Sequence, residues 1–157
     1  MTIIFGSDHA GFPLRRILAS RAIDLGYAVS EVGAQDEQPY DYPDAAGELA
    51  SRIQKGDADL GVLICGTGIG MSIAANRFKG VRAAVAWNER VARLAREHNF
   101  ANILCLGARL IDSDQAIEIF DAFLHEPVSG ETRHARRVAK MDAIVDAQTP
   151  TAIASQA

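Results

Sequence analysis

The run Leu60-Gly-Val-Leu-Ile-Cys-Gly-Thr-Gly-Ile-Gly70 holds the clearest structural signal in this chain. Its first six residues, Leu60–Cys65, are apolar without interruption, which is typical of a strand that helices cover on both faces. Three glycines follow within five residues, and a helical pattern with Ile73, Ala74 and Ala75 comes next. A buried strand, a glycine-rich loop and a helix in this order predict one unit of a parallel sheet.

The same alternation continues on both sides of this run. Apolar runs that predict strands lie at 2–6, 27–32, 60–65, 82–87 and 103–106. Amphipathic helical patterns follow each run, beginning near Pro13, Pro43, Gly70, Asn88 and Asp112 or Ser113, and Gly26 and Gly56 mark the ends of the first two. We therefore predict an α/β fold, a three-layer Rossmann-like sandwich with a five-stranded parallel sheet and right-handed crossovers.

A final helical stretch, from about Glu131 to Ala147, is not needed by a five-stranded sheet. We expect this extra C-terminal helix to pack on a partner subunit. The chain of 157 residues is predicted to form one domain over 1–147, followed by a flexible tail over 148–157.

Composition excludes several classes of function. The chain is 48% hydrophobic with a net charge of −4, which argues against disorder, nucleic-acid binding and a polybasic membrane surface. No apolar run approaches the roughly 18 residues of a membrane span, and the N-terminus has no signal-peptide pattern. Two cysteines form no disulfide framework, so we expect a cytoplasmic protein.

In an open parallel sheet, ligands bind beyond the carboxyl ends of the strands. This rule selects the loops 7–11, 65–70 and 107–109. The glycines of the second loop expose backbone N–H groups at the start of a helix, an arrangement that stabilises a phosphate or an oxyanion. Met71 stands where a Walker A lysine, the last glycine of a dinucleotide fingerprint or a phosphatase arginine would be needed, so these three motifs are excluded.

Cys65 precedes this loop and is the first catalytic candidate. The loop and the helix N-terminus favour its thiolate, which could act as a nucleophile or as a general base, although a free cysteine at the end of a strand is more often simply buried. Cys105 lies inside a strand and is interpreted as structural.

Other polar residues have a structural alternative beside the functional one. Asp8 and His9 could bind sugar hydroxyls or a phosphate, or Asp8 could cap the next helix. His98 and Asn99 end a helix, where a histidine often compensates the helix dipole. Arg133 and Arg137 lie one helical turn apart and could clamp a phosphate or form a solvated face. No His or Cys pair has metal-ligand spacing, so no metal is expected.

Taken together, the motifs resemble the type B ribose-5-phosphate isomerase family, which also includes the galactose-6-phosphate isomerase subunits of the lactose pathway. The matching segments are Gly6-Ser-Asp-His-Ala-Gly-Phe12, Asp41-Tyr-Pro-Asp44, Cys65-Gly-Thr-Gly-Ile-Gly-Met-Ser-Ile-Ala-Ala-Asn76, Glu97-His-Asn99, Leu104-Cys-Leu-Gly-Ala-Arg109 and Arg133-His-Ala-Arg-Arg137. The segment Cys65–Asn76 is highly specific, and the matches span the chain in order up to the tail.

The resemblance implies an aldose–ketose isomerase of the pentose phosphate pathway that interconverts ribose 5-phosphate and ribulose 5-phosphate through a cis-enediolate, without a cofactor. Cys65 would move the proton, His98 would open the sugar ring, and Thr67 and Asn99 would assist. Asp8 and Tyr42 would contact the sugar. The enediolate would be held by backbone amides of Gly66, Gly68, Ile69 and Gly70, and the phosphate by His9, Arg109, Arg133 and Arg137, with His134 nearby. The family implies a homodimer whose sites use both subunits, and further pairing into tetramers stays open.

The chain departs from the family pattern at Phe100, Glu131 and Thr132, where smaller residues or glycines are usual. These positions lie near the expected edge of the substrate. Another aldose phosphate, such as a tetrose, erythrulose or allose phosphate, is therefore an alternative substrate. A protein that binds phosphosugars without catalysis is a further alternative, although Cys65 and His98 would serve no purpose in it.

Overall fold

The computed structural model describes residues 1–148 and contains one sheet. The strands are β1 (Thr2–Ser7), β2 (Ala28–Gly33), β3 (Leu60–Cys65), β4 (Ala83–Val85) and β5 (Ile103–Gly107). The helices are α1 (Phe12–Asp24), α2 (Tyr42–Lys55), α3 (Ile69–Ala75), α4 (Glu89–Asn99), α5 (Ser113–His125) and α6 (Thr132–Gln148). All strand pairs are parallel, in the order β2-β1-β3-β5-β4, so the predicted α/β fold with a five-stranded parallel sheet is confirmed.

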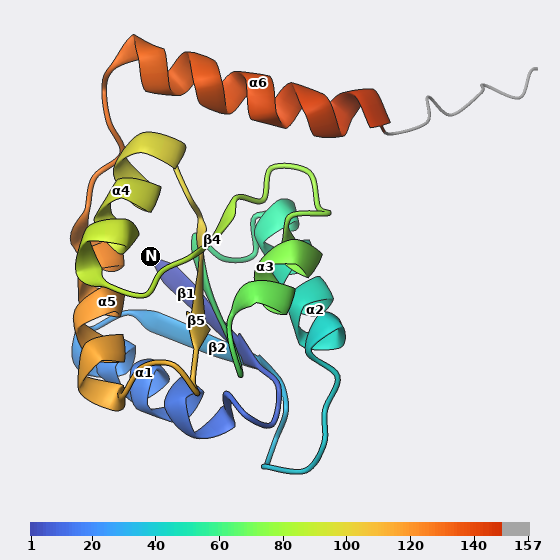
Figure 1. The fold of residues 1–157 in the computed structure, drawn as a ribbon, viewed down its shortest axis with the longest axis vertical. Coiled ribbons are helices and arrows are strands. Elements are labelled where there is room, and N and C mark those ends of the chain that lie inside the picture. Colours follow the sequence, from blue (N-terminus) through green and yellow to red (C-terminus); the bar gives the residue numbers. More distant parts are fainter. Residues whose placement is uncertain (149–157) are drawn as a thin grey trace, which may run out of the picture.

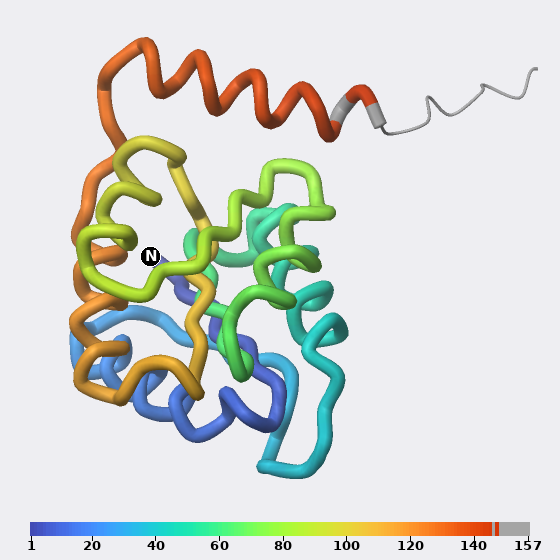
Figure 2. The backbone as a smooth tube through the Cα atoms, in the orientation of Figure 1, coloured from blue at the N-terminus to red at the C-terminus, as the bar shows by residue number. Residues whose placement is uncertain are grey.

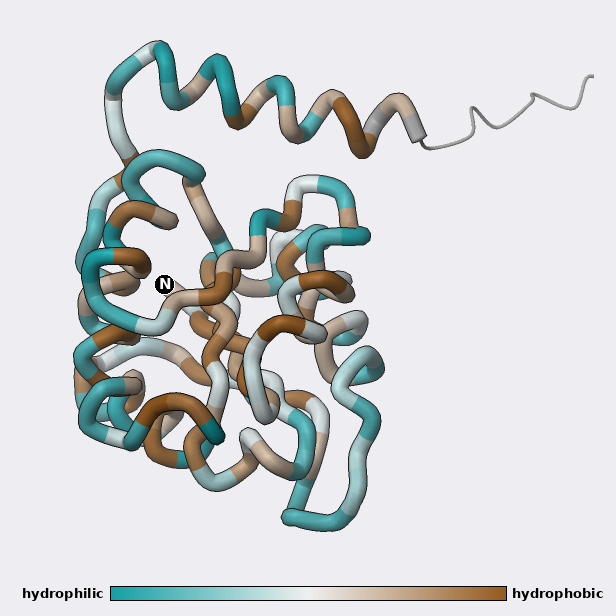
Figure 3. The backbone as a smooth tube through the Cα atoms, viewed as in Figure 1, coloured by the Kyte–Doolittle hydropathy of each residue, from teal (hydrophilic) through white to brown (hydrophobic). Residues whose placement is uncertain are grey.

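Two apolar clusters lie on the two faces of the sheet. One packs α1, α4 and α5 against it and includes Phe5, Leu18 and Phe120, whereas the other packs α2 and α3 through Leu49 and Met71. Figure 1 shows these two helical layers on either side of the strands, and Figure 3 shows that the hydrophobic segments concentrate between them. The three-layer prediction is confirmed.

Strand burial varies with position in the sheet. All six residues of the central strand β3 are buried, as its apolar run predicts. The edge strand β2 is only partly covered, and β4 has three residues where the apolar run predicted six. Trp87, which was expected in β4, is 64% exposed because the chain has already left the sheet.

Predicted helix ends are largely confirmed by hydrogen bonds. The Asn88 side chain accepts from the Val91 N–H at the start of α4, and Asp112 forms a capping box with Gln115 at the start of α5. Gly56 ends α2 in the left-handed region with φ +81°. In α3, Ile73 is 55% exposed, and the buried residues are Met71 and Ala75.

Helix α6 confirms the extra C-terminal helix and lies apart from the two layers. It crosses the end of the molecule at which the strands begin (Figure 1), and the chain reaches it by passing the end of α4 (Figure 2). Its packing on a partner remains a prediction. Of the predicted tail 148–157, Gln148 is the last residue of α6, and the rest lies outside the described residues. Within residues 1–148, no helix combines the length and apolarity needed to cross a membrane.

Candidate functional site

The structure separates the predicted site residues into two groups at opposite edges of the sheet. The carboxyl-edge group lies where the strands end and comprises Asp8, His9, Tyr42, Cys65, Gly66, Thr67, Gly68, Ile69, Gly70 and Arg109. The amino-edge group lies where β4 and β5 begin and comprises His98, Asn99, Arg133, His134 and Arg137.

Cys65 is the last residue of β3 and is 5% exposed. Its Sγ accepts a hydrogen bond from the Gly68 N–H at 3.1 Å, so the glycine-rich loop folds back over the sulfur. A backbone donor at the sulfur stabilises negative charge there, as expected for a cysteine that acts as a base.

Cys105 differs from Cys65 although it lies on the neighbouring strand. It is completely buried in β5, and burial, with a smaller contribution from Cys65, raises the pKa of its thiol far above the ordinary value. Cys105 therefore stays a neutral thiol in the core, and its structural interpretation is confirmed.

The loop after β3 has no room for side chains at its glycines. A Cβ on Gly68, which has φ +77°, would lie 3.0 Å from the Leu106 carbonyl carbon. A Cβ on Gly70 would lie 2.6 Å from two ring carbons of Tyr42. The backbone of this loop therefore lies directly against β5 on one side and the Tyr42 ring on the other.

Backbone hydrogen bonds join the loop after β3 to the loop after β5. The Ala108 N–H donates to the Cys65 carbonyl at 2.8 Å, and the Arg109 N–H donates to the Gly66 carbonyl at 3.1 Å. A Cβ on Gly66 would meet the Arg109 guanidinium at 3.3 Å, so this exposed cation lies over the loop. Thr67 Oγ1 accepts from the Ile69 N–H at 3.3 Å, so the N–H groups of Gly68 and Ile69 already have partners within the loop.

Asp8 and His9 follow β1 at the same edge. Asp8 is buried, and its Oδ1 accepts from the Gly11 N–H at 2.8 Å, so the carboxylate holds the turn before α1. The N-cap of α1 is Gly11, with no side-chain cap bond, so the alternative in which Asp8 caps this helix is wrong. His9 Nδ1 lies 3.2 Å from the Tyr40 nitrogen and 3.4 Å from the Tyr40 carbonyl oxygen, so the Tyr40 backbone holds the ring without selecting one tautomer.

In the amino-edge group, the His98 and His134 rings stack with centroids 4.2 Å apart and planes 10° apart. His98 Nε2 also lies 3.3 Å from Glu97 Oε2. His134 is 4% exposed, and its buried Nε2 has no hydrogen-bond partner. Burial first, and then the charges of His98 and Arg133, lower the pKa of His134, so this ring is neutral near pH 7.

Arg133 and Arg137 extend from exposed positions on the first turns of α6. Arg133 Nε pairs with Glu131 Oε2 at 2.6 Å. Asn99 is also exposed at the end of α4, and Phe100 ends that helix with φ +53°, which is unusual for a residue with a side chain.

The two groups do not meet within one chain. Gly107 is the β5 partner of Cys65, and the strand begins four residues earlier, at Ile103. At about 3.3 Å per residue, β5 alone separates its two ends by about 13 Å, and His98 lies beyond the beginning of the strand.

The structure also adds residues that the sequence analysis missed. Arg15 is 2% exposed, and its Nη1 donates to Ser7 Oγ at 3.1 Å and to the Val32 carbonyl at 2.7 Å. Its Nε pairs with Glu31 at 2.9 Å, so a buried cation supports the end of β1 next to Asp8. The sequence contained one signal for this burial, because Arg15 lies on the apolar face of the predicted helix.

Exposed apolar side chains follow the ends of three neighbouring strands at the carboxyl edge. Ile69, Trp87 and Leu110 are 55%, 64% and 65% exposed. Apolar residues exposed together commonly mark an interaction surface. Within residues 1–148, no cluster of three or more His, Cys, Asp or Glu side chains is arranged to hold a metal ion.

A sequence model of a known family, described as Ribose/Galactose Isomerase, matches residues 3–141. The chain belongs to the Ribose/Galactose Isomerase family. It is therefore an enzyme of the isomerase class, and the family resemblance drawn from its motifs is confirmed.

Relatives in this family match the chain over most of its length. Ribose-5-phosphate isomerase B of Escherichia coli is 40% identical over 142 residues, which is 90% of this chain and 95% of that protein. The structure of Clostridium thermocellum ribose-5-phosphate isomerase B is 44% identical, with a TM-score of 0.93, over 95% of this chain and all of that one. The type B enzyme of Trypanosoma cruzi is 39% identical with a TM-score of 0.91, over 94% of this chain and 98% of that one.

Proposed function

We propose that this isomerase interconverts ribose 5-phosphate and ribulose 5-phosphate through a cis-enediolate, with Cys65 as the base. The observation that carries the proposal is the placement of Cys65 under a glycine-rich loop whose Gly68 N–H donates to its sulfur. The names of the relatives support ribose 5-phosphate as the substrate.

The reaction moves one proton between two carbons. The Cys65 thiolate takes the proton from C2 of the open-chain aldose, and the electrons of the C2–H bond form the C1–C2 double bond while O1 becomes negative. The thiol then returns the proton to C1, O2 becomes the ketose carbonyl, and its hydroxyl proton passes to O1. Because the same group serves both carbons on one face, a single base suffices.

Stabilisation of the enediolate oxygen is the main demand of this reaction. The loop 66–70 leads into the N-terminus of α3, an end of a helix that favours negative charge, although in this structure the Gly68 and Ile69 N–H groups bond to Cys65 and Thr67. Each donor aimed at a developing oxyanion contributes about 3–4 kcal/mol in enzymes where one has been removed. Thr67 is an exposed residue of this loop, and its hydroxyl would also donate to the enediolate oxygen.

Two subunits complete the site in this proposal. Ring opening is assigned to His98, with Asn99 beside it, and both lie at the far edge of the sheet from Cys65. A homodimer in which the amino edge of one chain covers the carboxyl edge of the other brings these groups to Cys65. The exposed apolar side chains at the carboxyl edge, such as Trp87 and Leu110, support such a contact.

The phosphate is assigned to side chains from both edges. His9 and Arg109 at the carboxyl edge would hold it from one side, and Arg133 and Arg137 of the partner chain from the other. Neutral His134 would support the stacked His98 ring. The sugar hydroxyls are assigned to Asp8 and Tyr42. The scheme uses no metal or organic cofactor, and the two free thiols fit the cytoplasmic location that we propose with it.

The first test is ketose formation from ribose 5-phosphate in the presence of EDTA, with allose 6-phosphate and a tetrose phosphate assayed in parallel. We expect turnover of the pentose phosphate that persists in EDTA. Turnover of another sugar alone would reassign the substrate and point to Phe100 and the Glu131–Arg133 pair as its determinants. Absence of turnover on all three sugars would contradict the proposal.

A further inference from the structure

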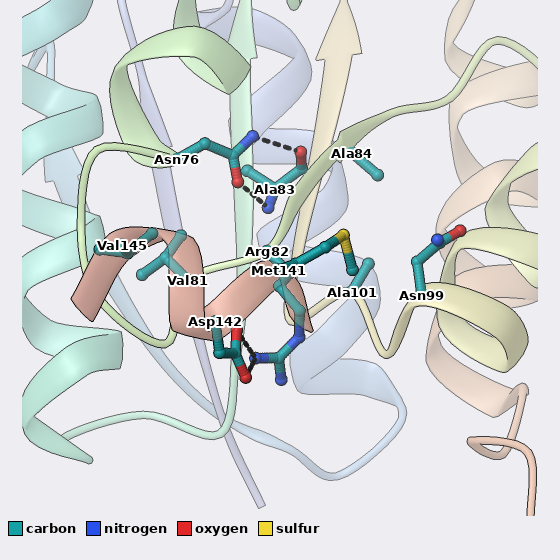
Figure 4. A pocket seen from close by; sticks show the side chains of 10 residues that line it. All are labelled: Asn76, Val81, Arg82, Ala83, Ala84, Asn99, Ala101, Met141, Asp142 and Val145. Carbon is teal, nitrogen blue, oxygen red and sulfur yellow. Dashed lines mark hydrogen bonds and ion pairs between the residues drawn. The ribbon is translucent and has the colours of Figure 1, made fainter. Parts of the chain in front are cut away.

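Arg82 connects three segments at the amino edge of the sheet. Its Nε donates to the Phe100 carbonyl at 3.0 Å, and its Nη1 lies 3.4 Å from the Gly80 carbonyl. The same Nη1 lies 3.3 Å from both carboxylate oxygens of Asp142 on α6. Figure 4 shows the Arg82 guanidinium and Asp142 facing one another, joined by dashed lines.

The segment held by Arg82 directly follows His98 and Asn99. Phe100 ends α4 in the left-handed region, and its N–H and that of Ala101 donate to the last carbonyls of the helix, while two arginine side chains bind carbonyls of the same turn. Arg82 holds the Phe100 carbonyl, and Arg96 Nη1 donates to the Ala101 carbonyl at 2.7 Å. Two guanidiniums therefore fix the turn at which the proposed ring-opening residues end.

The Asp142 contact fixes the direction of α6. Near its beginning, α6 is attached by the His98–His134 stack and by the buried side chain of Val138. Asp142 lies eight residues after His134, about 12 Å further along a helix. Two attachment points this far apart define the line of the helix, and with it the positions of Arg133 and Arg137.

Continuous packing does not supply this orientation. A cavity of about 350 Å³ lies between α6 and the amino edge, lined by Val81, Ala84 and Met141 among others. Figure 4 shows Met141 and Val145 of α6 on the same cavity as Arg82 and Asn99. Because this cavity interrupts the apolar packing beneath α6, the Arg82–Asp142 contact contributes to the orientation of the helix.

We propose that Arg82 and Asp142 are positioning residues for the isomerase reaction, which tie the phosphate-binding arginines of α6 to the turn that carries His98 and Asn99. The inference rests on the proposed function. Neither residue touches the substrate. Arg82 fixes the turn after His98, and Asp142 fixes the orientation of α6. His98 and the two α6 arginines therefore keep a constant spacing when they enter the partner's site.

Charge balance supports this pairing. Burial, followed by the positive charge of Arg82, lowers the pKa of Arg96, so the two guanidiniums lie close enough to repel each other. The Asp142 carboxylate offsets this repulsion. The Arg82 and Asp142 side chains are 23% and 41% exposed, and an ion pair with this exposure contributes little to folding. Its loss should therefore change substrate binding more than thermal stability.

The test compares steady-state kinetics and Tm of three variants. In Asp142→Asn we expect the KM for ribose 5-phosphate to rise about threefold, with kcat and Tm close to wild type. In Arg82→Lys, which keeps the charge and loses the Nε bond to Phe100, we expect kcat to fall about tenfold as well. The control is Arg93→Gln on α4, which removes ion pairs to Glu89 and Glu126 and should leave both constants unchanged.

The outcomes separate this inference from the proposed function. If the wild-type enzyme turns over ribose 5-phosphate and Asp142→Asn has an unchanged KM, the positioning role is wrong and the function stands. A fall in Tm with no separation between KM and kcat would also overturn it, because it indicates a purely structural role. If the wild type turns over no sugar phosphate, the function is wrong. The variants are then compared by their Kd for inorganic phosphate, where equal values would overturn the positioning role.

Discussion

At the carboxyl edge of the sheet the loops are bonded to one another, whereas at the amino edge the helix that carries two site arginines is attached at a few points. Cys65 is enclosed by hydrogen bonds from the loop after β5 and from Gly68. Arg133 and Arg137 lie on α6, whose described contacts with the rest of the chain include a ring stack, the buried Val138 and the Arg82–Asp142 ion pair. The comparison indicates that the proposed base is held by its own loop and the neighbouring one, whereas the proposed phosphate clamp depends on contacts between α6 and distant segments, such as the Arg82–Asp142 pair.

The largest effect is expected from removing the base. Cys65→Ala should lower kcat by about 10³-fold or more, because general-base catalysis is lost, while the Kd for inorganic phosphate stays close to wild type. Cys105→Ala is the matched control, since that buried thiol lies in the core and should matter only for stability. Near wild-type turnover in Cys65→Ala would exclude Cys65 as the base.

A smaller loss is expected from distorting the loop that encloses Cys65. In Gly68→Ala the new Cβ would press against the Leu106 backbone at a φ of +77°, and we expect kcat/KM to fall about 50-fold. Gly26→Ala is a matched control, because Gly26 has φ +85° and nothing within 4 Å of the new Cβ. Gly26→Ala should lose about 1–2 kcal/mol of the free energy of unfolding because of its positive φ alone, and Gly68→Ala should lose more because of the added contact with Leu106, as measured by urea unfolding. Equal kcat/KM in Gly68→Ala and Gly26→Ala would show that catalysis does not depend on the backbone conformation of the loop 66–70.

At the amino edge, the arginines are tested by separating binding from chemistry. Arg137→Ala should raise the KM about tenfold and leave kcat nearly unchanged, because a phosphate remote from the reacting carbons is held equally in the ground and transition states. Arg136→Ala, its exposed neighbour on α6, should have no effect. A large loss of kcat at constant KM would contradict the assignment of Arg137 to the phosphate.

The smallest effect concerns the stacked histidines and stability. The pKa of His134 is lowered in the folded chain, so below about pH 6.5 the unfolded chain binds more protons and the free energy of unfolding falls. We expect urea unfolding at fixed protein concentration to show this loss between pH 7.5 and 5.5, with a weaker pH dependence in His134→Gln. His125→Gln, at an exposed position at the end of α5, is the control. Identical pH dependence in wild type and His134→Gln would show that His134 does not titrate between the two states.

The sequence predicted the fold well because its signals are local. The apolar run at β3 and the caps at Asn88 and Asp112 each depend on neighbouring residues, and all three are confirmed. The predicted six-residue strand at 82–87 was wrong because hydrophobicity does not tell a strand from the exposed apolar residues that follow it, such as Trp87.

The site was predictable at the carboxyl edge and much less so elsewhere. Parallel strands must end together, so Cys65, Asp8 and Arg109 could be placed at one edge from the sequence alone. The roles of Arg15 and Arg82 depend on contacts with distant segments. The place of Arg15 on an apolar helix face hinted at burial, whereas no local pattern distinguishes Arg82 from a surface arginine. His98 lies far from Cys65 because α4 runs back to the amino edge of the sheet. That this separation calls for a second chain can be recognised only once the arrangement of the sheet is known.

The most direct test of the two-chain site is complementation between two inactive variants. Cys65→Ala and His98→Gln chains carrying different tags are co-expressed, the mixed dimers are purified, and ketose formation from ribose 5-phosphate is measured. If each site takes Cys65 from one chain and His98 from the other, one site of every mixed dimer is intact, and about half of wild-type activity should return. If both groups act within one chain, no intact site can form, and mixed dimers as inactive as the two parent variants would contradict the account.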